Sequence, residues 1–177
     1  MSLEGLIGAV RARALNAATR TDQVTPYLPV IAPRLSPAEL QDAEVVCGLR
    51  FPETLQRLYC EIGNGGFGPG YGFLPMTHAK SRYEDSIVDL FLVFSGKDAD
   101  DPTWEWPKGL LPIVDFGCAI RACVDCATGQ LIVSDPNLHE SSWSDTFLDQ
   151  GCTLDEWLAR WCAGENLWER IHGARGI

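Results

Sequence analysis

The sequence has no long apolar run. Its longest, residues 87–94, is eight residues long and includes an aspartate, whereas a transmembrane helix needs about 20. Three arginines stand within the first 20 residues, where a secretory signal would have its apolar stretch and cleavage site. We therefore expect a cytoplasmic protein that does not contact membranes.

Positive charge is also scarce. There are 14 lysines and arginines against 24 aspartates and glutamates, and the net charge is −10. The excess lies in residues 61–177, since residues 1–60 carry equal numbers of acids and bases, and no cation stands between Arg121 and Arg160. Such a surface repels nucleic-acid phosphates and attracts basic proteins. The alternative is an acidic face that only keeps the protein soluble.

Residue patterning predicts a single α+β domain with a twisted, mainly antiparallel sheet packed against helices. Capping boxes at Ser36–Glu39 and Thr153–Glu156 mark two helix starts. Helices are expected over residues 3–18, 37–48, 52–62, 83–95 and 153–164. The segment 83–95 is apolar on most sides, so we expect a buried helix there, with a strand as the alternative. Strands are expected over residues 72–76, 110–115, 119–125 and 130–134.

No motif selects a catalytic centre. The three histidines are isolated, and neither a nucleophile elbow nor a phosphate-binding loop occurs. Cys123 and Cys126 form a C-x-x-C, but the segment reads as a strand rather than the helix start that a redox motif needs. We expect seven reduced structural thiols and no catalytic residue, metal or cofactor, with a redox or metal role for Cys123 and Cys126 as an alternative.

Six tryptophans are present, and two of them, Trp157 and Trp161, fall on the apolar face of a predicted helix. The others include three that stand in polar, acid-rich segments, where aromatic anchors ringed by carboxylates would suit a basic partner. The predicted partner-binding residues are Asp98, Asp100, Asp101, Trp104, Glu105, Trp106, Glu140, Trp143 and Asp145. The alternative is that these tryptophans cover an edge of the sheet.

An ordered series of motifs resembles the SUKH superfamily, which includes fungal cell-wall assembly regulators of the Smi/Knr type. The series begins with the helix Pro52–Tyr59, the turn Gly63-Asn64-Gly65-Gly66 and the glycine-rich step to Gly72 and Phe73. It continues through Trp106-Pro107, Leu110–Ile113, Asp115, Gly117, Asp125, Thr128-Gly129, Asp135-Pro136, Leu154 and Trp157-Leu158. Residues 1–35 lie outside it and are interpreted as an N-terminal helix and linker preceding a SUKH-like domain at residues 36–177.

The resemblance implies a protein-binding role without catalysis. Asn64, Gly65, Gly66 and Gly72 carry over as structural turn residues. Bacterial members are commonly immunity proteins that neutralise toxins, often nucleases or deaminases, and this compact chain is more similar to that type. The leading hypothesis is therefore a cytoplasmic immunity protein that binds a basic toxin. A regulatory interaction module with an endogenous partner is the alternative.

Overall fold

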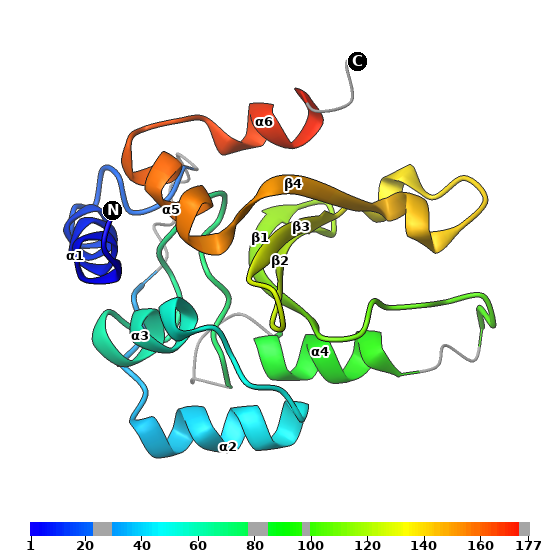
Figure 1. Cartoon of the computed structure of the whole chain (residues 1–177), viewed down its shortest axis with the longest axis horizontal. Helices are drawn as coiled ribbons and strands as arrows, with labels where there is room; N and C mark the ends of the chain where they lie inside the picture. The colour runs from blue at the N-terminus through cyan, green and yellow to red at the C-terminus, as the bar shows by residue number, and fades with distance from the viewer. Residues whose placement is uncertain (23–29, 78–84, 97–99, 174–177) are drawn as a thin grey trace.

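The structure is a computed structural model that describes residues 1–22, 30–77, 85–96 and 100–173 (Figure 1). Within these ranges the helices are α1 (Leu3–Leu15), α2 (Pro37–Cys47), α3 (Glu53–Glu61), α4 (Ile87–Ser95), α5 (Leu154–Cys162) and α6 (Leu167–Gly173). The strands are β1 (Leu110–Gly117), β2 (Ile120–Asp125), β3 (Gln130–Ser134) and β4 (Phe147–Thr153), with short 3-10 helices η1 (Pro136–Leu138) and η2 (Trp143–Thr146) before β4. No helix in the described ranges is both long and apolar enough to span a bilayer.

The four strands form one antiparallel sheet in the order β1-β2-β3-β4, which confirms the predicted α+β class. Leu111 pairs with Val124, and Val133 pairs with Leu148. The turn between β2 and β3 closes where the Gly129 amide donates to the Asp125 carbonyl at 2.7 Å. A meander of this kind needs only short connections, because antiparallel neighbours follow one another in the chain.

Helices α4 and α5 pack against the sheet, and α1, α2 and α3 gather at one end of the molecule (Figure 1). Helix α4 packs against β1 and also against α2, while α5 continues directly from β4. At the other end, the segments that follow α4 and β3 extend away from α1, α2 and α3 (Figure 1). The candidate site lies in those two segments.

Both predicted capping boxes are present. At α2 the Ser36 hydroxyl accepts from the Glu39 amide, and the Glu39 carboxylate accepts from the Ser36 amide at 2.8 Å. Thr153 and Glu156 make the same reciprocal bonds at α5. These bonds satisfy backbone donors that a helix start leaves open, which is why the sequence located both starts correctly.

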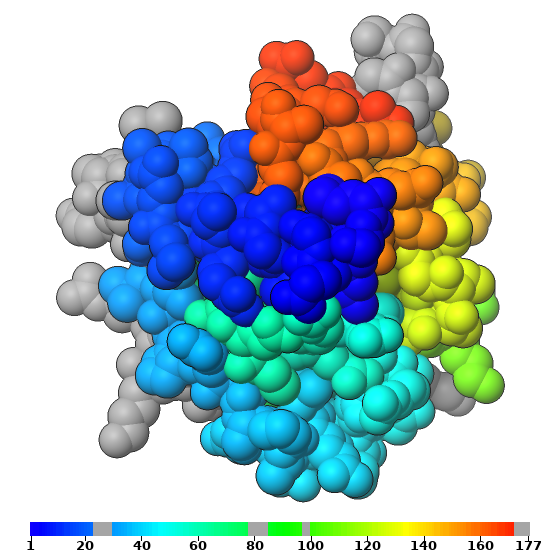
Figure 2. Space-filling view, turned by 60° about the vertical axis from the view of Figure 1, so that its left-hand side comes forward, coloured from blue at the N-terminus to red at the C-terminus, as the bar shows by residue number. Residues whose placement is uncertain are grey.

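Helix α1 belongs to the same hydrophobic core as the rest of the chain. It buries Leu6, Ile7, Val10 and Ala14 and packs against α5 and α3. Figure 2 shows α1 lying across the surface between the C-terminal helices and the α2–α3 region. Because these side chains are almost fully inaccessible, removing α1 would expose apolar surface on its neighbours.

Two predictions need correction, and two elements were missed. Residues 72–76 form no strand, but only a single bridge between Phe73 and Val114, where the Leu74 amide donates to the Ile113 carbonyl at 2.9 Å. Helix α4 is not buried all round, since Leu92 and Val93 are 49% and 69% exposed. Strand β4 and helix α6 were not predicted.

Candidate functional site

A cluster of aromatic rings joins α4 to the two segments at the far end of the sheet. We define the aromatic cluster as Phe94, Trp104, Trp106, His139, Trp143 and Phe147. The closest ring pairs are His139–Trp143, with centroids 4.3 Å apart, and Phe94–Trp106 and Trp104–Trp143, each at 4.6 Å. Trp106 also meets Phe147 edge-on at 5.3 Å. The structure therefore brings together all three tryptophans that the sequence selected.

The tryptophans of the cluster are fixed by hydrogen bonds as well as by ring contacts. Trp104 Nε1 donates to the Phe94 carbonyl at 2.7 Å, and Trp106 Nε1 donates to the Leu110 carbonyl at 2.8 Å. Trp143 Nε1 donates to Asp101 Oδ2 at 2.9 Å. Because each of these indole N–H groups already has an acceptor, the three tryptophans present ring faces and edges outward rather than N–H donors.

Carboxylates surround the cluster. The side chains of Asp100, Glu105, Glu140 and Asp145 are exposed, and the three tryptophans are partly exposed among them. Asp101 accepts from the Thr103 hydroxyl at 2.6 Å and from the Thr103 amide at 2.9 Å.

These Thr103 bonds, together with the bond from Trp143, hold the pKa of the Asp101 carboxyl below its ordinary value. Asp101 is therefore anionic at neutral pH. Asp98, the remaining predicted residue, lies outside the described residues.

Sequence reasoning missed part of this surface. Phe94, His139 and Phe147 were not selected, although each contacts a selected tryptophan. Leu92 and Val93 add exposed aliphatic surface on α4 next to Phe94. Helical spacing could have revealed the exposure of Leu92 and Val93, because positions 92 and 93 fall on the side of the helix opposite its buried face.

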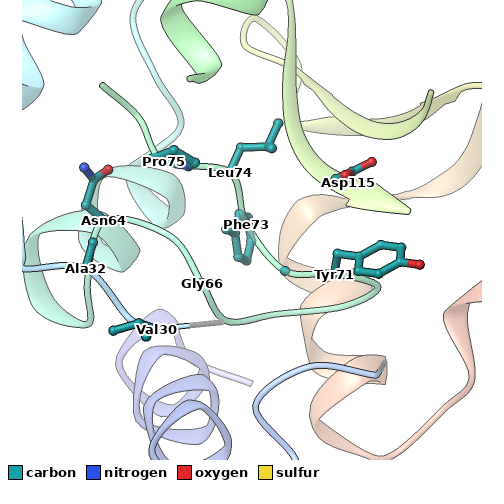
Figure 3. A pocket seen from close by; sticks show the side chains of 10 residues that line it. Val30, Ala32, Asn64, Gly66, Tyr71, Phe73, Leu74, Pro75 and Asp115 are labelled. Atoms are coloured by element: carbon teal, nitrogen blue, oxygen red, sulfur yellow. The ribbon is translucent and has the colours of Figure 1, made fainter. Parts of the chain in front are cut away.

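The Asn64-Gly65-Gly66 turn holds the chain together rather than forming a ligand site. Asn64 Oδ1 accepts from the Met76 amide at 2.7 Å, and Asn64 Nδ2 donates to the Thr77 carbonyl at 3.3 Å. A small cavity of about 30 Å³ adjoins the turn. Figure 3 shows Asn64 and Val30 on one side of it and Tyr71 on the other. This volume suits one or two water molecules and no organic cofactor.

A wider groove of about 440 Å³ lies between α2 and α3. Its central carboxylate, Glu44, is buried and accepts from the Phe51 amide at 2.7 Å and from Arg50 Nη1 at 2.9 Å. The same carboxylate lies 3.4 Å from Gln56 Nε2. These bonds tie the end of α2 to the start of α3, so the polar groups of this groove serve the fold.

All seven cysteines are free thiols, and all except the exposed Cys118 lie in settings that suppress their reactivity. Burial raises the pKa values of Cys123 and Cys126 to about 12 each and that of Cys47 to about 11. The thiolate is the reactive form, so raised pKa values suppress redox and metal chemistry at neutral pH. In the ranges that the structure describes, no three His, Cys, Asp or Glu side chains are grouped to hold a metal ion.

Comparisons with known proteins add two findings. Residues 34–159 match the SMI1 / KNR4 family (SUKH-1), a span that contains the whole aromatic cluster and leaves α1 and α6 outside. The chain is also 31% identical over 109 residues to a Bos taurus protein named "Isoamyl acetate-hydrolyzing esterase 1 homolog". That match covers 54% of this chain and 43% of the bovine protein, so the chain spans less than half of that relative's length.

Proposed function

Because this chain belongs to the SMI1/KNR4 family (SUKH-1), we propose that it is a non-catalytic binding protein that neutralises a basic toxin. Members of this family are typically immunity or regulatory binding proteins. The proposed toxin is of the nuclease or deaminase class, because enzymes that act on nucleic acids carry basic surfaces toward their substrate phosphates. The observation that carries the proposal is the aromatic cluster with its rim of exposed carboxylates.

Binding would proceed in two physical stages. The acidic rim attracts the basic face of the toxin over several ångströms of solvent and speeds their encounter. The partly exposed tryptophans then provide the buried apolar contact, since tryptophan is enriched among residues that dominate binding energy. Their positions are fixed by hydrogen bonds and ring contacts, so little side-chain freedom is lost on binding. The bound protein would neutralise the toxin by covering or distorting its active site.

Affinity capture from the source organism and its relatives tests the proposal directly. The tagged protein is used as bait, and the bound proteins are washed at low and then at high salt. We expect a basic nuclease-like or deaminase-like protein in a stoichiometric complex. Capture of endogenous signalling or cell-wall proteins alone would instead support the regulatory module, which is the second function typical of this family.

Charge variants then locate the interface. Glu105→Gln with Glu140→Gln removes two exposed acids from the rim, and Asp42→Asn with Glu165→Gln removes two exposed acids elsewhere. Both pairs change the net charge equally, so a general charge effect would slow association equally. We expect the rim pair to slow association several-fold at low salt and by much less at high salt. Equal association rates for both pairs would refute the proposed location.

The bovine relative's name refers to ester hydrolysis by that protein. The non-catalytic proposal predicts that this chain releases no acetate from isoamyl acetate above the buffer rate. Acetate release that follows protein concentration and survives repurification would refute that part of the proposal.

A further inference from the structure

In the parts of the chain that the structure describes, two pairs of consecutive large aliphatic residues are exposed. Val45 and Val46 form one pair on α2, and Leu92 and Val93 form the other on α4, each side chain at least 49% exposed. Single exposed apolar residues are ordinary on protein surfaces, whereas apolar residues that gather into a patch mark interaction sites. The two pairs differ in what lies next to them.

The α4 pair adjoins the aromatic cluster. Leu92 and Val93 lie in the last turn of α4, together with Phe94. The Phe94 ring packs on Trp106 at 4.6 Å, and the Phe94 carbonyl accepts from Trp104 Nε1 at 2.7 Å. Because a helix rises about 1.5 Å per residue, the pair lies within about 3 Å of Phe94 along the helix axis. Figure 1 shows α4 running toward the end of the molecule that carries the cluster.

The valine pair of α2 has no such continuity. Helix α2 carries no aromatic residue, so it makes no ring contact with the cluster. The two pairs are otherwise alike, since both are exposed, aliphatic and set in helices. The α2 pair is therefore a matched control for the α4 pair.

The electrostatic setting of the α4 pair is negative. The last turn of α4 holds no basic residue, and the C-terminal end of a helix carries a partial negative charge. Glu105 is exposed between the two tryptophans that contact Phe94, and the whole chain has a net charge of −10. A second copy of this chain would bring like charges to the contact, which opposes binding. The surface therefore suits a partner that combines apolar side chains with positive charge.

We propose that the exposed face of α4 at Leu92 and Val93 extends the partner-binding surface of the aromatic cluster, and that an apolar segment of the partner flanked by lysine or arginine covers it. This inference rests on the proposed function and specifies what the basic partner must carry. Burial of the two aliphatic side chains supplies binding energy by removing apolar surface from water. The carboxylates of the cluster then attract the flanking cations of the partner.

The test uses two capped peptides of equal charge as probes. One is an amphipathic leucine–lysine peptide, and the other is the same peptide with every leucine replaced by serine. Binding to the full chain is followed by NMR through the methyl signals of leucine and valine, assigned by substitution. We expect the leucine peptide to bind about ten-fold more tightly at physiological salt and to shift the signals of Leu92 and Val93 most. Equal affinities, or largest shifts elsewhere, would overturn the inference.

Two matched double variants locate the contact. Leu92→Gln with Val93→Gln removes the aliphatic surface of α4, and Val45→Gln with Val46→Gln makes the same change on α2. All four positions are exposed and glutamine favours helices, so both variants should keep the far-UV circular dichroism of the wild type. We expect the α4 variant to bind the leucine peptide about ten-fold more weakly and the α2 variant to change by less than about two-fold. Equal losses would refute the assignment to α4.

Sedimentation equilibrium of the full chain tests whether a second copy covers α4 instead. We expect a monomer, because the charges around the α4 pair repel their own kind. A dimer that the α4 variant abolishes and the α2 variant retains would assign this face to self-association and overturn the inference.

Failure of this inference is distinguishable from failure of the proposed function. If a captured basic partner needs Glu105 and Glu140 but binds the α4 variant as tightly as the wild type, the α4 assignment is wrong and the binding function stands. If α4 binds the leucine peptide as expected but no basic protein is captured, the surface stands and the toxin proposal fails.

Discussion

Substitution of Gly65 by alanine is expected to cost far more stability than the same change at Gly129. Both glycines have positive φ angles, +84° at Gly65 and +74° at Gly129, so an alanine at either position pays a backbone penalty of about 1–2 kcal/mol. The surroundings differ. A Cβ at Gly65 would lie 2.7 Å from the Phe73 carbonyl oxygen and 2.9 Å from the Leu74 carbonyl carbon. At Gly129 nothing lies within 4 Å.

The contact at Gly65 cannot be relieved by a rotating side chain, because the atoms it meets are backbone. Those backbone atoms are themselves held, since the Phe73 carbonyl accepts from the Gly66 amide at 2.9 Å and the Leu74 carbonyl accepts from the Tyr59 hydroxyl. Forcing them apart adds about 1–3 kcal/mol, the usual cost of overpacking a core. We therefore expect Gly65→Ala to lose about 2–5 kcal/mol and Gly129→Ala about 1–2 kcal/mol.

Urea denaturation followed by tryptophan fluorescence measures both losses. The comparison is valid if the two variants unfold with the same denaturant dependence as the wild type, since stability alone then sets the midpoint. Equal midpoints for the two variants would show that the close contacts at Gly65 carry no energetic weight. The reasoning that the turn is a tightly packed structural element would then be wrong.

Three further outcomes are expected. Arg13→Ala should lower the free energy of unfolding by about 2–3 kcal/mol, because it removes packing and hydrogen bonds at a side chain that is only 19% exposed. Arg11→Ala is the control, and at a side chain that is 40% exposed it should cost under about 1 kcal/mol. Thermal unfolding measures both losses. Hydrogen bonds in the capping box at α5 lower the pKa of the Glu156 carboxyl in the folded protein. The ionised carboxylate therefore stabilises the folded state fully at pH values above the unfolded-state pKa of Glu156. This contribution is lost as the pH falls through the folded-state pKa. The stability difference between wild type and Glu156→Gln should accordingly shrink in acid, and a constant difference would contradict this. Mass spectrometry at neutral pH should show exposed Cys118 alkylated at least roughly tenfold faster than Cys123.

Local chemistry explains what the sequence could predict. Helix α2 was located at its start because Ser36 and Glu39 satisfy backbone donors within four residues, and at its end because Gly48 adopts the left-handed conformation. The turn at Asn64 was likewise evident from its own residues. In these places the information lies within one turn of chain, and no distant contact needs to be known.

Distant contacts explain what the sequence could not predict. Strand β4 alternates in burial, but its buried positions include the polar Gln150, and a glycine follows at position 151, so the pattern looks like a loop until β3 pairs with it. The bond between Trp143 and Asp101 joins residues 42 apart. The sequence selected both residues from composition, and their juxtaposition required the fold.

The distribution of charge gives the proposed encounter a direction. Five ion pairs join described side chains within residues 4–61, the part of the sequence where acids and bases nearly balance. The acidic excess lies in residues 61–177, and the segments that carry the aromatic cluster lie at the end of the molecule away from α1, α2 and α3 (Figure 1). Under the proposed function, the carboxylates around the aromatic cluster would draw an approaching basic protein to this end of the molecule. The same carboxylates that speed the encounter would then favour the orientation in which the tryptophans meet the partner.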